Sequence, residues 1–210
     1  MLNMKKWLIA LASAAVMAFS PVSAQNFQEG VHYRVIGDTP SSSPEIIDFF
    51  SLYCNACYHF AGFSDMLKAE FGDAFKKHHV NSVVPNATMR DNIQRIHATS
   101  IVLGIEEQFV ERVFQRHFVR NSFVNTVADA KQIMLDLGVE EAAFDRAFNS
   151  FAVTSLSNRM RALQQQFGVS ATPTYVVNRK YQMLQSGFQN SSNFYEEYMA
   201  LAKYLMAKKD

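Results

Sequence analysis

The feature that most constrains this chain is a pair of cysteines, Cys54 and Cys57, in the stretch FFSLYCNACYHF. They are the only cysteines among 210 residues. A disulfide between them would close a loop of about four residues and contribute about 2 kcal/mol before strain, against about 5 kcal/mol for a loop of about 100 residues. A chain of this length can bury a core that is large enough for it to fold without a disulfide bond. We therefore expect the pair to have a chemical role.

The surroundings of the pair favour redox chemistry. The run EIIDFFSLY, residues 45–53, is typical of a buried strand, and a helical spacing of apolar residues follows the pair. Cys54 would then lie at the exposed N-terminal end of a helix, where unpaired N–H groups and the helix dipole favour thiolate over thiol. Cys57, one turn further on, would be partly buried. We predict that Cys54 is the nucleophile and that Cys57 resolves the mixed disulfide formed at Cys54.

Metal binding is a second interpretation, because His59, His78 and His79 lie near the pair in the sequence. A structural zinc site takes four ligands at characteristic spacings, and the sequence has no second cysteine pair. His78 and His79 are neighbours in a predicted strand, so their side chains should point to opposite faces, one packed and one solvated. We expect no metal ligand and no cofactor.

The N-terminal sequence predicts export. Lys5 and Lys6 precede an apolar run of 13 residues, WLIALASAAVMAF, and Val22-Ser23-Ala24 has the form that a signal peptidase cleaves. A membrane span needs roughly 20 apolar residues, so an uncleaved anchor is the weaker alternative. We predict a signal peptide over residues 1–24, cleaved after Ala24, and a protein that works where disulfides persist.

The charge of the chain argues against some partners. Loss of residues 1–24 removes two lysines and no acidic residue, so the formal net charge moves from +1 to −1. A nearly neutral chain lacks the basic surface that nucleic acids require. We therefore expect no nucleic-acid partner.

The segments around the cysteines predict a mixed α/β fold. Phe60, Phe63, Leu67 and Phe71 share one helical face, and Gly72 is placed to end that helix. The run KKHHVNSVV, residues 76–84, is the next predicted strand. Near the C-terminus, residues 172–178 and 181–187 predict two strands around a polar turn, and residues 192–209 predict an amphipathic helix capped near Ser192.

Between these parts the apolar spacing is helical from about residue 88 to 161, with breaks expected at Gly104, Asn121 and Gly138. No strand pattern fits this block. We therefore expect an α/β domain that is interrupted by an all-helical insertion. The predicted division places residues 25–82 and 160–210 in the α/β domain and residues 83–159 in the insertion.

Thr172-Pro173 is a candidate substrate-binding element. Proline fits poorly within a strand except at an edge or where a cis bond makes a turn, and we expect a cis bond here. Such a bond would leave the Thr172 backbone free to pair with an extended peptide. A trans proline that merely starts the strand is the alternative.

The segments IIDFFSLYCNACYHF, KKHHVN, FNSFAVTSL, ATPTYVVNRKYQ and AKYL, in this order, resemble the DsbA family of bacterial periplasmic thiol:disulfide oxidoreductases. The resemblance implies a thioredoxin-like fold with a helical insertion. It also implies a periplasmic donor of disulfides to unfolded or newly exported cysteine-containing proteins, reoxidised by a membrane quinone-linked partner of the DsbB type. The chain has no room for the dimerisation region of related isomerases, so a monomer is expected.

The resemblance also implies roles for other residues. The family keeps an acid and a lysine buried beneath the active site, and by position these are Asp48 and Lys77. A carboxylate within EIIDFF must find a partner or shift its pKa, unless it points to solvent from an edge strand. We assign redox tuning to Asp48, Lys77 and the dipeptide Asn55-Ala56.

Two departures from the family bear on the direction of catalysis. Asn55-Ala56 replaces the Pro-His dipeptide of its best-known members, which removes the imidazole that helps to hold the thiolate. Thr172 stands where strongly oxidising members have valine. We therefore predict a weaker oxidant than the Pro-His enzymes. A disulfide reductase or isomerase of the same fold stays open as an alternative, as does a non-catalytic binding or metal-handling protein.

Overall fold

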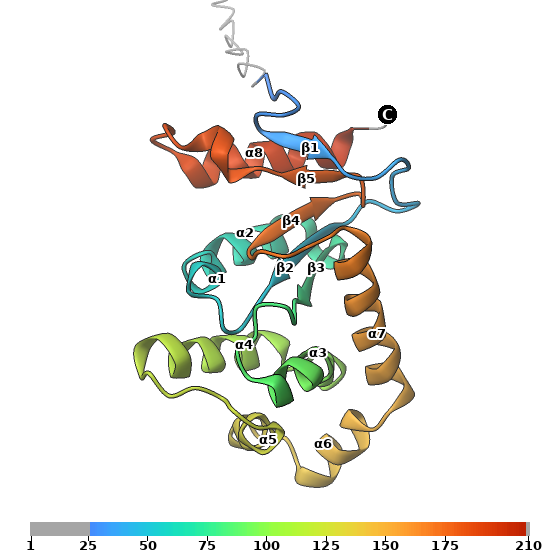
Figure 1. Cartoon of the computed structure of the whole chain (residues 1–210), viewed down its shortest axis with the longest axis vertical. Coiled ribbons are helices and arrows are strands. Elements are labelled where there is room, and N and C mark those ends of the chain that lie inside the picture. The colour runs from blue at the N-terminus through green and yellow to red at the C-terminus, as the bar shows by residue number, and fades with distance from the viewer. Residues whose placement is uncertain (1–25, 209–210) are drawn as a thin grey trace, which may run out of the picture.

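The computed structural model describes residues 26–208 and contains a mixed five-stranded sheet (Figure 1). The strands lie in the order β1-β5-β4-β2-β3. Their bounds are Tyr33–Val35 for β1, Ile46–Phe50 for β2, Phe75–His79 for β3, Thr174–Val177 for β4 and Tyr181–Met183 for β5. Only β2 and β3 pair in parallel, and the other neighbours are antiparallel. Strand β2 is paired on both sides, with β4 and β3, and so gives the cysteines that follow it a fixed base.

Helices on one face of the sheet come from both ends of the chain. Helices α1 (Asn55–His59) and α2 (Ala61–Phe71) follow β2, and α8 (Phe194–Ala207) closes the chain. Phe63 and Leu67 of α2 share one buried apolar cluster with Tyr198 and Leu201 of α8. Gly72 ends α2 with a φ of 53°, a conformation that costs glycine little. The helix predicted from the spacing of these residues is confirmed, although it is divided at Phe60.

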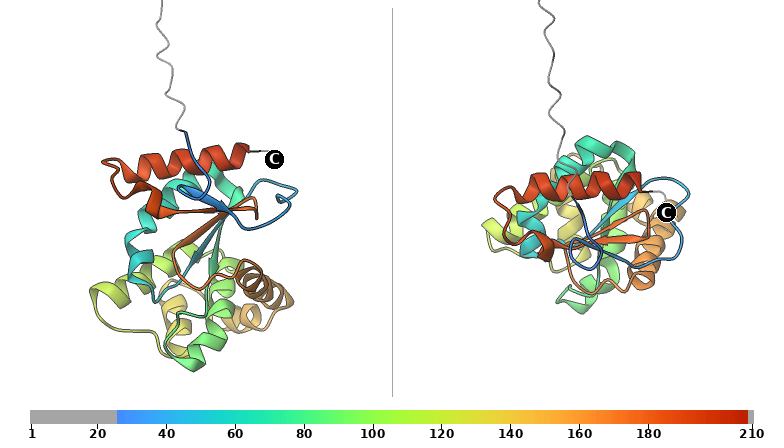
Figure 2. Two further views of the ribbon diagram at one scale, coloured as in Figure 1. Left: turned by 45° about the horizontal axis from the view of Figure 1, so that its top comes forward. Right: turned by 90° about the horizontal axis from the view of Figure 1, so that it is seen from above.

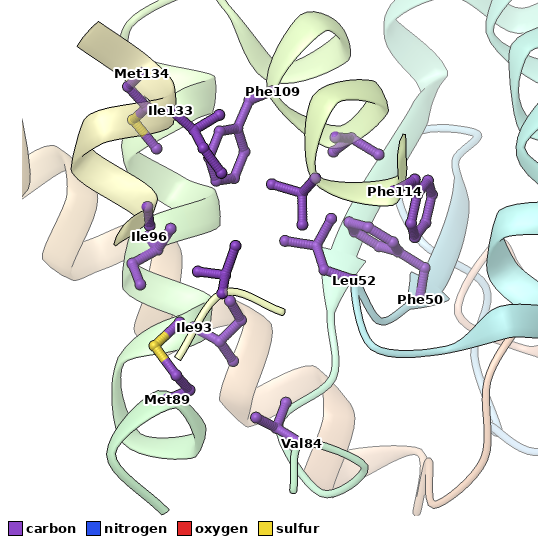
Figure 3. Close-up of a cluster of buried hydrophobic side chains, with 14 of the residues drawn as sticks. Phe50, Leu52, Val84, Met89, Ile93, Ile96, Phe109, Phe114, Ile133 and Met134 are labelled. Carbon is purple, nitrogen blue, oxygen red and sulfur yellow. The ribbon is translucent and has the colours of Figure 1, made fainter. Parts of the chain in front are cut away.

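The helical block lies between β3 and β4 and occupies the far end of the molecule from α8 (Figures 1 and 2). Its helices are α3 (Ala87–Val102), α4 (Glu106–Phe114), α5 (Val127–Asp136), α6 (Glu141–Phe148) and α7 (Phe151–Gln166). A π-helical turn, Gln115–Val119, directly continues α4. The block has its own apolar core, which Phe50 and Leu52 enter from the sheet side (Figure 3). The helical core therefore reaches the segment that precedes the cysteines.

The breaks predicted within the helical block are confirmed by its backbone. Gly104, Asn121 and Gly138 all have positive φ values, 71°, 50° and 92°. A further break, between α6 and α7, was not predicted; Ser150 caps α7 there by accepting from the Val153 N–H. Helix α7 continues to Gln166, so the predicted division at residue 159 falls within one helix, and the domain boundaries stay a prediction.

Two features of the sheet differ from expectation. The sequence pattern did not reveal β1, a three-residue edge strand paired with β5. The expectation of one packed and one solvated histidine was wrong, since His78 and His79 are 2% and 0% exposed. Their side chains point to opposite faces, and both faces are covered. Phe167, just beyond α7, packs beside Phe49 on one face, while the helical block covers the ring of His79 through His97 on the other.

The predicted signal peptide, residues 1–24, lies outside the described residues. Within residues 26–208, no helix combines the length and the apolar character needed to cross a membrane. The N-cap residue of α8 is Asn193, one position after the predicted cap at Ser192. Its side chain makes no capping hydrogen bond.

Candidate active site

Cys54 lies at the N-cap of α1, at the end of a tight turn that leaves the sheet. Strand β2 ends at Phe50, and the Cys54 N–H then donates to the Ser51 carbonyl at 3.1 Å. Cys54 has an extended backbone, φ −103° and ψ 111°, and its Sγ accepts a hydrogen bond from the Cys57 N–H at 3.2 Å. A serine or aspartate oxygen usually fills this position and satisfies an unpaired N–H of the first turn. Here the sulfur does so.

This position stabilises negative charge on Cys54. Its pKa is lowered to about 6, first by a hydrogen bond from the Cys57 thiol, and further by Thr172 and the backbone N–H groups of Cys57 and Ala56. Burial opposes these effects, but Cys54 remains partly exposed. Cys54 is therefore mostly thiolate at neutral pH and accessible to another sulfur.

Cys57 is the opposite kind of cysteine. Its side chain is only 4% exposed and packs in the apolar core of the helical block. Burial raises the pKa of its thiol far above the usual range, and the negative charges of Asp48 and Cys54 raise it further. Both sulfurs are unbridged in the structure. The pair thus combines a reactive, accessible thiolate with a protonated, enclosed thiol.

The Thr172-Pro173 segment comes from the other end of the sequence and lies against Cys54. The peptide bond between these residues is cis. The Thr172 carbonyl oxygen is 3.3 Å from Cys54 Sγ and accepts from its thiol when that is protonated. Both residues are partly exposed, directly before β4. The structure thus brings these two predicted site residues beside the cysteines, while their role in substrate binding stays a prediction.

Asp48 is buried on β2, with 2% exposure, so the alternative of a solvent-facing carboxylate is wrong. Its Oδ2 accepts a 2.7 Å hydrogen bond from Ser64 Oγ, while its buried Oδ1 has no partner among the described residues. Burial raises the pKa of Asp48 to about 6, against the opposing effects of Lys77 and the Ser64 bond. This carboxyl can therefore take up a proton near neutral pH.

Lys77 lies opposite Asp48 in the parallel register of β2 and β3. Unlike the expected buried lysine, it is only partly buried, and its ammonium group lies 5.9 Å from the centroid of the Phe50 ring. Its charge lowers the pKa of Asp48, and the charge of Asp48 in turn raises the pKa of Cys57. The geometry connects both residues to the cysteines electrostatically, and their redox-tuning role stays a prediction.

The dipeptide between the cysteines is exposed. Asn55 Nδ2 lies 3.4 Å from His59 Nε2, and Ala56 contributes its backbone N–H to Cys54. No group of three or more His, Cys, Asp or Glu side chains within residues 26–208 is arranged to hold a metal ion.

Sequence reasoning missed three residues that hydrogen-bond to Asp48 or to the turn before Cys54, namely Ser64, His79 and His117. Ser64 was detectable, because a polar residue between Phe60 and Leu67 on the apolar face of a helix has to pair with a buried group. The other two bind the turn before Cys54 and come from β3 and the π-helical turn. No local pattern brings them together.

Comparison with known proteins agrees with this site. A model of the DSBA-like thioredoxin domain matches residues 64–198. Thiol:disulfide interchange protein DsbA of Salmonella typhimurium is 31% identical over 213 residues, covering 98% of this chain and 100% of that protein. The protein of the same name from Escherichia coli K12 is 28% identical over the same coverage.

Solved structures share the fold. Proteus mirabilis DsbA, in a complex with a non-covalently bound peptide, has a TM-score of 0.78 at 24% identity and covers 87% of this chain and 100% of its own. DsbA from Klebsiella pneumoniae has a TM-score of 0.78 at 23% identity and covers 88% of this chain and 100% of its own. These similarities confirm the predicted fold class, thioredoxin-like with an all-helical insertion.

Proposed function

Because this chain belongs to the DSBA-like thioredoxin domain family and is a thiol:disulfide oxidoreductase, we propose that Cys54-Asn55-Ala56-Cys57 donates its disulfide to exported proteins. The observation that carries the proposal is the contrast between the two sulfurs. Cys54 is partly exposed with a pKa of about 6, whereas Cys57 is buried with a raised pKa. A sulfur that is stable as thiolate is a good leaving group, and the exposure of Cys54 makes it the point of attack.

In the proposed reaction, the Cys54–Cys57 disulfide is the oxidant. A substrate thiolate attacks Cys54 Sγ, the S–S bond to Cys57 breaks, and the released Cys57 sulfur takes up a proton. A second substrate thiolate then attacks the substrate sulfur of the mixed disulfide and releases Cys54 as thiolate. The substrate loses two electrons and the enzyme gains them. In the reverse direction Cys57 attacks Cys54 and resolves the mixed disulfide.

Single cysteine variants test these roles. Cys54→Ser should abolish exchange, because the accessible sulfur is lost. Cys57→Ser should accumulate mixed disulfides with cysteine-containing proteins, because no second sulfur reaches Cys54. Non-reducing electrophoresis gives the readout after each variant, in its thiol form, meets an unfolded protein that still contains disulfides. The Cys54 thiolate then attacks a substrate disulfide, and one substrate sulfur leaves as thiolate. Equal trapping by both variants would contradict the assignment.

For substrate binding, we propose that an extended cysteine-containing peptide lies along Thr172 and Pro173. The cis bond and the 3.3 Å approach of the Thr172 carbonyl oxygen to Cys54 support this site. Proteus mirabilis DsbA has been solved with a bound peptide that contains one cysteine, which supports the same substrate class here. Chemical-shift changes on adding such a peptide to Cys54→Ser should centre on residues 171–174. Changes confined to other surfaces would contradict the site.

The cellular setting is also a proposal. The signal-like sequence before residue 25 supports a periplasmic location and cleavage after Ala24. We propose that the chain acts as a monomer and that a membrane quinone-linked protein of the DsbB type reoxidises it. Sequencing of the exported N-terminus, sedimentation analysis and capture of a membrane protein by Cys57→Ser test these points separately.

A reductase or isomerase remains the second candidate, and two observations favour it. Ala56 offers the thiolate only a backbone N–H, and Thr172 stands before the cis-proline. Equilibration of the Cys54/Cys57 couple with glutathione distinguishes the two directions. A potential well above that of the glutathione pool would indicate an oxidase, and one near or below it a reductase or isomerase.

A further inference from the structure

Two buried histidines bind the backbone of Leu52, two residues before the nucleophile. The Leu52 N–H donates to His79 Nε2 at 3.0 Å, and the Leu52 carbonyl oxygen accepts from His117 Nδ1 at 2.8 Å. Both imidazole side chains are 0% exposed. His79 comes from β3 and His117 from the π-helical turn, so one residue is bound from the sheet and from the helical block together.

These bonds define the protonation of both rings. A carbonyl oxygen can only accept, so His117 carries its proton on Nδ1, and its Nε2 accepts from the Val124 N–H at 2.9 Å. An N–H can only donate, so His79 accepts on Nε2 and carries its proton on Nδ1, which has no partner in the described part of the chain. Both rings are neutral, and burial, the main cause, lowers the pKa of each.

A second connection reinforces the first. The Tyr53 hydroxyl donates to the Val124 carbonyl oxygen at 2.6 Å, and the centroid of its ring lies 4.8 Å from that of His117. Val124 therefore has its N–H bound to His117 and its carbonyl bound to Tyr53. The side chain of Leu52 points into the core of the helical block (Figure 3). The turn before Cys54 is thus held through both its backbone and its side chains.

We propose that His79 and His117 are positioning residues, which fix the turn Ser51–Cys54 so that Cys54 Sγ meets the first N–H groups of α1. The physical reason is geometric. The Cys54 thiolate is stabilised by directional bonds, including the 3.2 Å bond from the Cys57 N–H, and these weaken when the sulfur shifts. Neither histidine touches the reacting atoms in the described structure, so each acts through Leu52. The inference rests on the proposed exchange at Cys54.

Two matched pairs of variants separate positioning from simple loss of packing. Asparagine places its amide near the histidine Nδ1 position, and glutamine places its amide near Nε2. His117→Asn therefore keeps a donor for the Leu52 carbonyl, and His117→Gln loses it. At His79 the pattern reverses, because His79→Gln keeps an acceptor for the Leu52 N–H and His79→Asn loses it.

The readout is the acid dissociation constant of the Cys54 thiol in the reduced protein, from thiolate absorbance and the pH dependence of alkylation. His117→Gln and His79→Asn should lower this constant by roughly three- to tenfold, the loss expected for one hydrogen bond. His117→Asn and His79→Gln should stay within about twofold of wild type. Four folded variants that all titrate like the wild type would overturn the proposal, as would equal losses for asparagine and glutamine at both positions.

A measurement on the unsubstituted protein keeps the inference testable if a variant does not fold. Long-range ¹⁵N–¹H spectra should show both rings as Nδ1–H tautomers, and a proton on Nε2 of either ring would overturn the arrangement. Failure of this inference can be distinguished from failure of the proposed function. Equal reactivity of Cys54 and Cys57 in the wild-type protein would contradict the exchange roles, whereas unaltered Cys54 titration in the variants would contradict only the positioning by histidine.

Discussion

Acidification should destabilise this protein from pH 7 to pH 5, because three of its buried histidines resist protonation. Burial is the main cause in each case, and it lowers the pKa of His78 to about 3, that of His79 well below the usual range, and that of His117. Nearby positive groups add to the effect, Arg159 and Lys76 at His78 and Arg116 at His117. In the unfolded chain a histidine titrates near 6.5.

The sign follows from proton binding. Below about pH 6.5 the unfolded chain takes up a proton at each of these histidines more readily than the folded chain does, so the free energy of unfolding falls with pH. His78, whose pKa is about 3, costs about 2 kcal/mol between pH 7 and pH 5, and His79 and His117 add to the loss in the same direction. Asp48 acts in the opposite direction, because its pKa is raised to about 6 and the folded chain is protonated there first. Asp48 offsets about 1.3 kcal/mol of the loss, which is less than His78 alone costs, so the free energy of unfolding should still fall from pH 7 to pH 5.

The assay has to exclude the nucleophile, whose own lowered pKa contributes stability that is lost as pH falls through about 6. We therefore choose the Cys54→Ala background and measure urea unfolding at pH 7, 6 and 5. The only tryptophan, Trp7, precedes the predicted cleavage site, so far-ultraviolet circular dichroism is the suitable probe. His78→Phe keeps a ring against Phe49 and removes one titrating group, so it should reduce the loss between pH 7 and pH 5 by about 2 kcal/mol.

The matched control is His59→Gln, which replaces an exposed histidine on α1 and keeps all three buried rings. A free energy of unfolding that stays constant or rises from pH 7 to pH 5 in the Cys54→Ala protein would refute the reasoning, because the loss from His78 alone exceeds the gain from Asp48. So would a pH dependence that His78→Phe leaves unchanged.

Three further predictions concern the active site. Ala56→His should raise the reduction potential by roughly 30 to 65 mV, the equivalent of one charge-assisted hydrogen bond to the Cys54 thiolate, and an unchanged potential against glutathione would show that other groups dominate. Ser64→Ala removes the donor to Asp48 and should lower the free energy of unfolding by about 1 to 3 kcal/mol at pH 8 and by less at pH 5, since the protonated acid needs no donor; equal losses at both pH values would count against it. Lys77→Met should raise the pKa of Asp48 above its value of about 6, as followed by its carboxyl ¹³C shift, because a stabilising charge is removed.

The predictable parts of the fold are those that depend on the spacing of residues within a single helix or strand. The repeat of Phe60, Phe63 and Leu67 identifies a helix and its buried face, and the same face contains Ser64 and so points towards Asp48. Gly104 and Gly138 identify helix ends, because their positive φ values suit glycine. Cys54 at a strand-to-helix junction likewise follows from the two patterns that meet there.

The parts that were not predictable depend on what packs from elsewhere. The burial of both His78 and His79 requires cover on both faces of the sheet, which comes from segments far along the chain. The short strand β1 exists only through its pairing with β5. The bond from His117 to Leu52 joins residues 65 apart in the sequence. Spacing within one element carries no information about such contacts.

The expected strength of the disulfide as an oxidant follows from the pKa of Cys54. Lowering the pKa of Cys54 from 9.0 to about 6 stabilises its thiolate by about 4 kcal/mol in all, at about 1.4 kcal/mol per unit. At pH 7, however, a reference thiol with a pKa of 9.0 is protonated. Only the difference between a pKa of about 6 and pH 7 therefore stabilises the reduced form. The reduced form thus gains about 1.4 kcal/mol, or about 30 mV for a two-electron couple. Each further unit by which the pKa of Cys54 is lowered would raise the reduction potential by about another 30 mV. We therefore predict that the bonds to the Cys54 thiolate make the disulfide a moderate oxidant, and that a further donor at position 56 would make it a stronger one.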